Sequence, residues 1–306
     1  MLIENTLFGE RNKLQEAIKR LQSFEPSEGY YVAFSGGKDS QCIYHLCKLA
    51  GVKFDAHYNV TSVDPPELIR FIRENYPDVS FDYPRYKDGT VATMWNLIPK
   101  KMFPPTQKFR YCCKILKESS GIGRVTVTGV RWAESSSRKN QQSVAVIHTD
   151  KKDTIEDAIA RSGSARVNER GGLVLNDDND ENRRTVEQCY RTRKTLVNPI
   201  VDWEDEDVWE FLNDVVKVPH CELYDKGYTR LGCIGCPMSN QGMKESLEKY
   251  PKYKEAYLRA FKRMLDVVKS KGKERVWQTP EEVYQWWTNL YHKRYEIKNA
   301  HTIGED

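Results

Sequence analysis

Six consecutive residues combine the groups that can hold a phosphate: Ser35, Gly36, Gly37, Lys38, Asp39 and Ser40. They follow the apolar run 30–34 and precede a stretch with helical periodicity. Adjacent glycines permit a turn whose amide N–H groups converge, while the lysine and the serine hydroxyls add donors at the positive end of the next helix. We therefore expect a pyrophosphate-binding loop, which differs from Walker A in its spacing. A flexible Gly-Ser turn is the alternative, which the lysine and the strand-loop-helix setting disfavour.

Four of the eight cysteines stand in two tight clusters far apart in the sequence: Cys112 with Cys113, and Cys233 with Cys236. Four thiolates can close one metal site. Structural zinc usually takes two Cys-x-x-Cys pairs, whereas adjacent cysteines direct their sulfurs differently and more readily reach separate irons of a cuboidal cluster. The spacing therefore favours a 4Fe-4S cluster over zinc, and free or redox-active thiols are the third alternative.

The other cysteines lack such neighbours. Cys42 and Cys47 fall in the helical stretch after the loop and are expected to be packing residues. Cys189 and Cys221 have no close cysteine partner, so each is either a sulfur-carrying nucleophile or an inert thiol.

The elements around the loop alternate between strand and helix. The predicted elements are a helix at 39–50, a strand at 54–60, a helix at 65–76, and strands at 79–83 and 124–130. This order predicts an α/β fold with a parallel, doubly wound sheet, which binds ligands at the carboxyl ends of its strands. The last strand ends just before Arg131, and we therefore expect Arg131 at the same edge as the loop.

The rest of the chain divides by composition. Residues 150–194 are polar and rich in Asn, Asp and Gly, which predicts a long exposed insertion. Residues 241–306 are basic and aromatic with helical periodicity, and the motif from Thr279 to Glu282 has capping-box spacing. We therefore expect a domain at 1–240 that carries both the loop and the cysteines, followed by a helical C-terminal extension at 241–306.

The overall charge does not identify a partner. The 48 basic and 44 acidic residues leave a net charge of +4, which is too small to indicate nucleic acid. No segment has the roughly 18 apolar residues of a membrane span, and the first residues lack the basic and apolar parts of a signal sequence. We expect a soluble cytoplasmic protein without membrane contact.

Further motifs follow in order, and together they resemble one family. They are Cys112-Cys113, Gly129 to Arg131 with Ser135 to Arg138, Asn198-Pro199-Ile200-Val201-Asp202-Trp203, and Gly227-Tyr228 with Gly232-Cys233-Ile234-Gly235-Cys236. Over about residues 28–240 the chain resembles the phosphoadenosine phosphosulfate (PAPS) reductase family, a branch of the PP-loop ATP pyrophosphatase superfamily. The resemblance implies a fold of adenine nucleotide α-hydrolase type. Its cysteine layout is similar to that of iron-sulfur adenylylsulfate reductases, which implies that a 4Fe-4S cluster is bound by Cys112, Cys113, Cys233 and Cys236.

Two departures from the family's reductases change the expected reaction. Their phosphate loop is degraded because their substrate has no β,γ-pyrophosphate, whereas residues 35–40 are intact here. Their nucleophilic cysteine lies in a C-terminal segment, whereas this chain has no cysteine after Cys236. The chain therefore looks most like the ATP pyrophosphatase component of bacterial DNA phosphorothioation systems, which implies ATP pyrophosphatase and sulfurtransferase activity.

The resemblance also assigns roles to single residues. The 35–40 loop would hold the β- and γ-phosphates of ATP, while Lys38, Arg131, Arg138 and Mg²⁺ neutralise charge as an acceptor oxygen attacks the α-phosphate. Asp39 is either a Mg²⁺ ligand or a carboxylate that complements the helix dipole, and the two arginines either contact phosphate or form surface salt bridges. The remaining nucleotide-binding candidates are Asn59 and Thr61, which follow the second strand and are expected to frame adenine, together with Gly129 and Ser135.

Other functions stay open. They are reduction of adenylylsulfate or phosphoadenylylsulfate through Cys189, Cys221 or a partner's thiol, thiolation of tRNA, and non-catalytic nucleotide sensing. The cluster could deliver sulfur, relay electrons or brace the fold. A cysteine desulfurase or another sulfur donor is the expected partner. The basic residues between 252 and 275 either contact DNA or form solvated helix faces, and the sequence does not set the oligomeric state.

Overall fold

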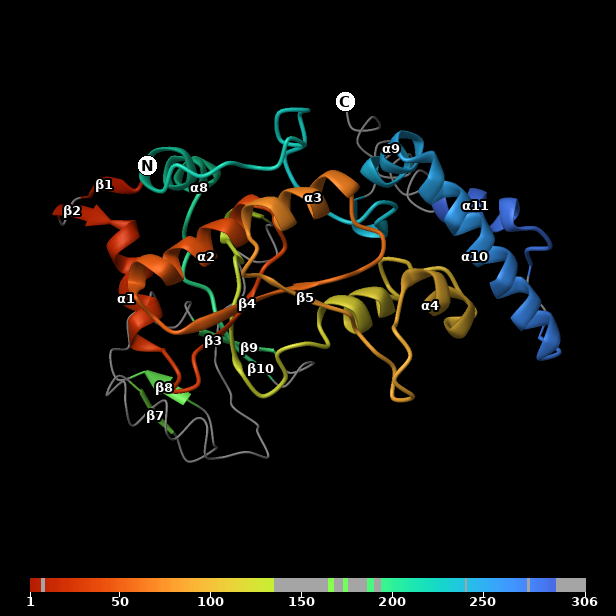
Figure 1. Cartoon of the computed structure of the whole chain (residues 1–306), viewed down its shortest axis with the longest axis horizontal. Helices are drawn as coiled ribbons and strands as arrows, with labels where there is room; N and C mark the ends of the chain where they lie inside the picture. The colour runs from red at the N-terminus through yellow and green to blue at the C-terminus, as the bar shows by residue number, and fades with distance from the viewer. Residues whose placement is uncertain are drawn as a thin grey trace, which may run out of the picture. The chain divides into compact units, whose positions relative to one another are not determined.

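The computed structural model of the chain describes residues 1–6, 9–134, 165–167, 173–175, 186–189, 194–239, 241–273 and 276–289 (Figure 1). The strands are β1 (Ile3–Thr6), β2 (Gly9–Asn12), β3 (Tyr30–Ala33), β4 (Phe54–Asn59), β5 (Ser80–Asp82), β6 (Val125–Val127), β7 (Ala165–Val167), β8 (Leu173–Leu175), β9 (Val186–Cys189) and β10 (Lys194–Val197). The α-helices are α1 (Lys13–Ser23), α2 (Lys38–Ala50), α3 (Pro66–Asn75), α4 (Met94–Lys101), α8 (Asp205–Glu210), α9 (Gln241–Lys249), α10 (Pro251–Ser270) and α11 (Pro280–Asn289).

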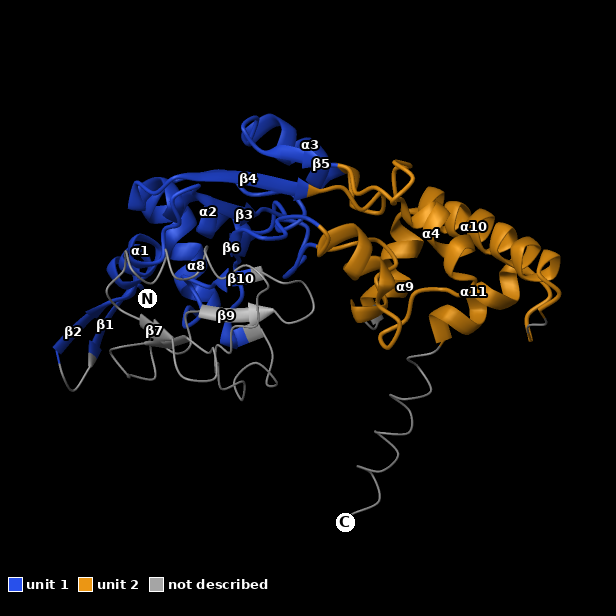
Figure 2. Cartoon of the chain, turned by 90° about the horizontal axis from the view of Figure 1, so that it is seen from below, with its two compact units in different colours: residues 1–58, 67–82, 120–231 blue, residues 59–66, 83–119, 232–306 orange. Residues whose placement is uncertain are grey.

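The chain divides into two compact units, which Figure 2 colours separately. Unit 1 comprises residues 1–58, 67–82 and 120–231, and unit 2 comprises residues 59–66, 83–119 and 232–306. The units are interleaved along the chain, whereas the sequence predicts one domain at 1–240 and an extension at 241–306. The difference arises because α4, from the middle of the chain, packs on α10.

A parallel sheet forms the framework of unit 1. Within the described residues its strands lie in the order β5-β4-β3-β6-β10-β9; β3 is parallel to β4 and β6, and β10 is parallel to β6. The central strand β3 is buried on both faces, since its neighbouring residues Tyr31 and Val32, which point to opposite faces, are both buried. The α/β fold with a parallel sheet that the sequence predicts is confirmed.

The strand order places a topological switch point between β3 and β6. From β3 the chain proceeds outward through β4 to β5, whereas β6 and β10 lie on the other side of β3. Ligands of such sheets bind outside the carboxyl ends of the strands where the order reverses. The segments 34–37 and 128–131, which follow β3 and β6, therefore leave the sheet at the position where a ligand is expected.

Part of the predicted 150–194 insertion joins this sheet. Strand β9 pairs antiparallel with β10 at the edge of the sheet, and β7 pairs antiparallel with β8. The end of the predicted insertion therefore forms an edge strand, because the backbone N–H and C=O groups of β10 can pair with another strand. Most other residues of the insertion lie outside the described residues.

Helix α2 connects the loop to the rest of unit 1. It contacts α1 and α8, and its Cys42 and Cys47 are fully buried, which confirms their expected packing role. Gly51 ends the helix in the left-handed region with a φ of 68°, and its N–H donates to the Lys48 carbonyl. The helix is therefore fixed at both ends by glycine.

A buried ion-pair cluster links α1 and β2 to the segment after β10. The Asp202 carboxylate, which is 7% exposed, accepts from Arg20 Nη1 at 2.6 Å and from Arg11 Nη2. Burial alone would raise the pKa of Asp202, but the hydrogen bond and charge of Arg20, together with the charge of Arg11, hold this pKa below its usual value of 3.8. The ionised carboxylate therefore stabilises the folded chain.

We expect Asp202→Asn to lower the free energy of unfolding by about 3 kcal/mol near neutral pH, because two guanidinium groups lose a buried anionic partner. Since the folded-state pKa is depressed, the wild-type advantage is present above the unfolded-state pKa and is lost as the pH falls through the folded-state pKa. Urea titrations of both proteins from neutral pH down into the acid range measure the difference. Asp214→Asn, at an exposed carboxylate, is the control. A difference that stays constant at all pH values would contradict the ion-pair account.

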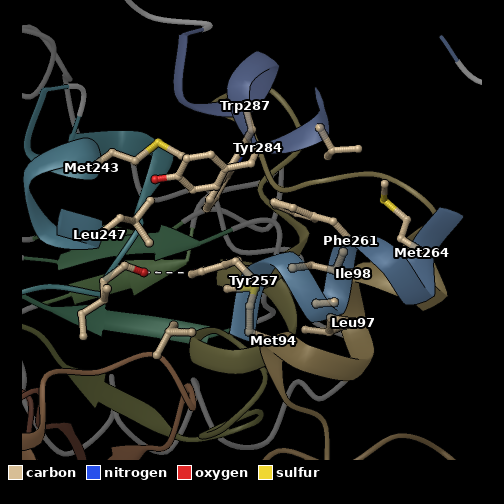
Figure 3. Packing of buried hydrophobic residues seen from close by; sticks show 14 of the residues in the cluster. Met94, Leu97, Ile98, Met243, Leu247, Tyr257, Phe261, Met264, Tyr284 and Trp287 are labelled. Atoms are coloured by element: carbon tan, nitrogen blue, oxygen red, sulfur yellow. Dashed lines mark hydrogen bonds between the residues drawn. The ribbon is translucent and has the colours of Figure 1, made fainter. Parts of the chain in front are cut away.

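Helices α4, α9, α10 and α11 build the core of unit 2, which is shown in Figure 3. Its labelled residues are Met94, Leu97, Ile98, Met243, Leu247, Tyr257, Phe261, Met264, Tyr284 and Trp287. The capping box of α11 is present, because Thr279 Oγ1 accepts the Glu282 N–H at 3.2 Å and the Glu282 carboxylate accepts the Thr279 N–H at 3.4 Å. The helical periodicity predicted after residue 240 therefore belongs to helices whose apolar sides form this core.

Among the described α-helices, none combines the length and apolar character needed to cross a membrane. The 20-residue α10 carries lysine and arginine side chains from Lys252 to Lys269.

Candidate functional site

The loop after β3 folds tightly against α3. Gly36 has a φ of 73°, and a Cβ atom at this position would lie 2.7 Å from side-chain atoms of Leu68 and Ile72. The backbone conformation therefore favours glycine here, and any larger residue would also have to shift the ends of the Leu68 and Ile72 side chains. Gly37 follows as the N-cap residue of α2, so the first amide groups of the helix are presented at its positive end.

The donors of this loop are bonded to protein groups within unit 1. The Lys38 N–H donates to the Tyr224 hydroxyl at 2.8 Å. Ser35 Oγ donates to Ser40 Oγ at 3.1 Å, and Ser40 Oγ donates to the Gly37 carbonyl at 2.8 Å. The predicted phosphate-binding groups therefore converge, and each of these three donors has a partner inside the fold.

Arg131 joins two carboxylates beside the loop. Its guanidinium is buried and donates from Nε to Asp39 Oδ1 at 2.7 Å, from Nη2 to Asp205 Oδ1 at 2.6 Å, and from Nη1 to the Trp203 carbonyl at 3.1 Å. Lys38 Nζ lies 3.0 Å from the same Asp205 oxygen. Burial would raise the pKa of Asp205, but hydrogen bonds from Lys38 and Arg131 hold it below its usual value. Two cations and two carboxylates therefore form one network at the start of α2.

Gly129 allows the end of β6 to approach α2. A Cβ atom at Gly129 would lie 2.8 Å from the Asp39 carbonyl oxygen, which is closer than side chains approach backbone in folded proteins. The glycine therefore sets the short distance between the segment that carries Arg131 and the helix turn that carries Asp39.

The four predicted metal-ligating cysteines all belong to unit 2 and are unpaired and partly buried. Cys112 and Cys113 open a π-helical turn at Cys113–Lys117. The second pair lies in a turn in which the Cys236 N–H donates to the Cys233 carbonyl at 3.2 Å, and Gly235 has a φ of 70°. The intervening Ile234 is held on both sides, because its N–H donates to the Val63 carbonyl and its carbonyl accepts from the Tyr257 hydroxyl (Figure 3).

The surroundings of these thiols shift their pKa values in different directions. A hydrogen bond from Cys112, followed by one from Arg110, lowers the pKa of Cys113 to about 6, while its partner Cys112 has a raised pKa. Burial raises the pKa of Cys233 to about 11, although the nearby Lys117 ammonium opposes this shift. The charge of Cys233 in turn raises the pKa of Lys117. Cys113 is therefore the thiol that ionises most readily of the three.

The thiols fit a metal cluster by ligand type. Thiolates are the usual ligands of iron-sulfur clusters, and Cys112 is close enough to Cys233 for their charges to interact. In the part of the chain that the structure describes, however, no three Cys, His, Asp or Glu side chains converge as ligands of one metal ion. The sulfurs therefore form two neighbouring pairs in unit 2, without the closed arrangement of a bound metal.

The sequence profile of the phosphoadenosine phosphosulfate reductase domain matches residues 29–239. The chain belongs to this family. The matched part of this PAPS reductase domain contains the glycine loop, the Arg131 network and all four of the cysteines.

Two of the relatives that this chain resembles are longer proteins than this chain. An uncharacterized protein of Methanocaldococcus jannaschii is 26% identical over 295 residues, which cover 92% of this chain and 57% of that protein. A second uncharacterized protein of the same organism is 30% identical over 237 residues, which cover 74% of this chain and 40% of that protein. The adenosine 5'-phosphosulfate reductase of Oceanobacillus iheyensis is 37% identical over 51 residues, which cover 17% of this chain and 21% of that protein. The chain thus spans about half the length of the two uncharacterized relatives.

Solved structures with a partial likeness bind nucleotides or phosphate. Candida glabrata FMN adenylyltransferase in complex with FAD and inorganic pyrophosphate has 14% identity and a TM-score of 0.41, and the match covers 72% of this chain and 62% of that one. The PAPS reductase of Candida auris in a phosphate complex has 15% identity and a TM-score of 0.40, with 72% and 87% covered. Neither likeness bears on the chemistry of the site.

Lys38, Asp39 and Arg131 are brought together in this PAPS reductase domain, as the sequence predicts for one sheet edge. The alternative of a surface salt bridge is wrong for Arg131, because this residue is buried, and its contact with phosphate stays a prediction. Arg138 and Ser135 lie outside the described residues, and their predicted roles stay predictions.

Asn59 and Thr61 make hydrogen bonds within unit 2. Asn59 Nδ2 donates to the Lys117 carbonyl at 3.3 Å. Both the N–H and the hydroxyl of Thr61 donate to Asp64 Oδ2, at 3.1 and 2.6 Å. Thr61 therefore shapes the turn after β4, and contact of either residue with adenine stays a prediction.

Sequence reasoning missed two residues of the loop site, Asp205 and Tyr224. Asp205 stands in an acidic run at the start of a helix, a pattern that normally indicates only capping and dipole effects. Tyr224 precedes the Gly227-Tyr228 motif, but nothing in its spacing relates it to Lys38. Its contact with the loop arises from packing between residues 186 positions apart.

Proposed function

We propose that the chain binds ATP at the 35–40 loop and cleaves the bond between its α- and β-phosphates, which releases pyrophosphate and adenylates an acceptor. The observation that carries the proposal is the intact loop, which presents the first amides of α2 and Lys38 at the switch point of a parallel sheet. Membership of the PAPS reductase family supports an adenine nucleotide as the substrate.

The residues of the loop suit this reaction. A bond forms between the acceptor oxygen and the α-phosphorus while the bond to the α,β-bridging oxygen breaks, and its electron pair leaves with pyrophosphate. Lys38 and the amides at the start of α2 stabilise the charge that develops on this leaving group. Arg131 orients Asp39, whose carboxylate oxygens are of the type that Mg²⁺ prefers. A bound Mg²⁺ would neutralise charge on the phosphates.

We further propose that sulfur at the sulfide level then displaces AMP from the adenylated acceptor, with DNA as the acceptor and a cysteine desulfurase or another sulfur donor as the partner. The exposed side of α10 supports a nucleic-acid partner, because Lys252, Lys262 and Arg263 are exposed there. Glu255 interrupts this basic surface and lies 3.7 Å from Arg259, so the charge is not continuous.

We propose that Cys112, Cys113, Cys233 and Cys236 hold a 4Fe-4S cluster, which would supply redox or sulfur-handling chemistry when bound. Protein purified without oxygen is expected to contain about four irons and four sulfides per chain. Cys113→Ser and Cys236→Ser should lower both contents, whereas Cys47→Ser, at a buried cysteine in unit 1, should not. Zinc without sulfide, or no metal at all, would contradict the cluster.

A second candidate is reduction of adenylylsulfate or phosphoadenylylsulfate. The local match to adenosine 5'-phosphosulfate reductases favours it, with Cys189, Cys221 or a partner's thiol as the nucleophile. Thiolation of tRNA would share the ATP step and differ only in the acceptor.

Two assays on the same preparation separate these functions. The proposed function predicts AMP and pyrophosphate from ATP in the presence of DNA and a sulfur donor, and phosphorothioate linkages in the DNA. The reductase function predicts sulfite and AMP from adenylylsulfate and a thiol reductant, without ATP. Sulfite release without any ATP cleavage would overturn the proposal. Thiolated nucleosides in tRNA, without phosphorothioate linkages in DNA, would overturn DNA as the acceptor and show that tRNA is the acceptor.

A further inference from the structure

The Tyr224 hydroxyl lies where a phosphate oxygen would be expected on the glycine loop. It accepts the Lys38 N–H at 2.8 Å, and it is also the nearest side-chain atom to a Cβ built on Gly37, at 3.4 Å. The Lys38 N–H is one of the first amides of α2, which have no acceptor within the helix. In this structure a tyrosine oxygen therefore satisfies a donor that the phosphate site needs.

Tyr224 is held in place by Trp209 of α8 and by the residues around it in the chain. Its ring packs edge-on against Trp209 at a centroid distance of 5.0 Å and against His220 at 6.1 Å. The neighbouring Cys221 and Leu223 are fully buried, and the Tyr224 N–H donates to the Cys221 carbonyl at 3.0 Å. The backbone around Tyr224 is therefore anchored, and we expect the hydroxyl to leave the loop by rotation of the side chain.

The other polar groups of the loop also have partners within the protein. The Ser35 and Ser40 hydroxyls bond within the loop, and Lys38 Nζ is bound by Asp205. Lys38 Nζ also lies 3.3 Å from Asp39, and Asp205 is 62% exposed, so solvent screens part of its attraction for Lys38. Each contact is of the kind that a phosphate oxygen can replace, and together they describe a loop that is satisfied without a ligand.

We propose that Tyr224 is a specificity-determining residue whose hydroxyl stands in for a phosphate oxygen, so that a ligand gains the Lys38 N–H only by displacing it. This inference rests on the proposed function. A ligand that reaches the Lys38 amide must replace one hydrogen bond, whereas a ligand that binds elsewhere on the domain is unaffected. Tyr224 also returns to the amide when pyrophosphate leaves, which favours release of this product.

Tyr224→Phe tests the proposal, because it removes the hydroxyl and keeps the ring against Trp209. Calorimetric titration with pyrophosphate is expected to show binding about two- to tenfold tighter than in the wild type, the range of one net hydrogen bond. Binding of AMP should not change. Tyr83→Phe, at an exposed tyrosine outside the loop, is the matched control. Unchanged or weaker pyrophosphate binding in Tyr224→Phe would overturn the proposal.

A second measurement does not depend on nucleotide chemistry. Hydrogen exchange of the Lys38 amide in the ligand-free protein should be faster in Tyr224→Phe than in the wild type, because the amide loses its acceptor. An equal exchange rate would overturn the contact itself. If neither protein binds pyrophosphate, the proposed function fails, and the exchange rates still decide whether Tyr224 occupies the amide.

Discussion

Lys38→Ala is expected to lower ATP-dependent pyrophosphate release by about 10²- to 10³-fold, the usual effect of removing one preorganised charge from a phosphoryl-transfer site. The Lys38 ammonium is held beside the first turn of α2 by Asp205 at 3.0 Å and Asp39 at 3.3 Å. Both carboxylates remain after the substitution, and so the site becomes more negative and repels the phosphates of ATP. Initial rates with saturating ATP, together with the affinity for ATP, measure the effect.

Lys48→Ala is the matched control for this experiment. Lys48 lies in the last turn of the same helix, is half exposed and pairs with Asp78 at 3.6 Å. Its removal should change the rate by less than about twofold, because a surface ion pair contributes little to stability. Full activity of Lys38→Ala would exclude catalysis at the loop and would favour a non-catalytic nucleotide-sensing role.

Arg131→Ala is expected to have the largest effect on stability, lowering the free energy of unfolding by about 3–5 kcal/mol. The guanidinium is buried, and its loss leaves Asp39 with Lys38 as its remaining cation and the Trp203 carbonyl without this donor. Asp205 is more exposed and is expected to contribute little to this loss. Urea unfolding of both proteins measures the difference.

The same substitution should also abolish ATP cleavage by protein that remains folded, because Asp39 is no longer oriented. Arg131→Lys tests this positioning role, since one ammonium cannot bridge two carboxylates and a carbonyl. It should recover part of the stability and little of the activity. Arg259→Ala, which breaks an exposed ion pair on α10, is the control and should change neither. An Arg131→Ala protein with wild-type stability would contradict the network described here.

The elements near the loop could be predicted from the sequence because their signals are local. The helix predicted at 39–50 is α2 at Lys38–Ala50, since glycine stands at each end and apolar residues recur at helical spacing between them. The strand predicted at 54–60 is β4 at Phe54–Asn59. The expectation that Arg131 lies near the loop is confirmed, because parallel strands end at a common edge.

The partners of these residues could not be predicted, because they depend on packing between distant segments. The sequence places Arg131 near the loop, but only the fold shows that its donors face Asp39, Asp205 and a carbonyl. Similarly, the spacing of the cysteines indicates two pairs, and only the fold places both pairs in unit 2. Local composition does not predict that the two units are interleaved along the chain. Residues 83–119 lie more than a hundred positions before the helices on which they pack.

A structure of the chain with an ATP analogue that resists cleavage between the α- and β-phosphates tests the central claim most directly. The account predicts that oxygens of the β- and γ-phosphates lie within hydrogen-bond distance of the amides at the start of α2 and of Lys38 Nζ, with the Tyr224 hydroxyl displaced. An analogue bound away from the 35–40 loop, or bound with only its α-phosphate there, would contradict it.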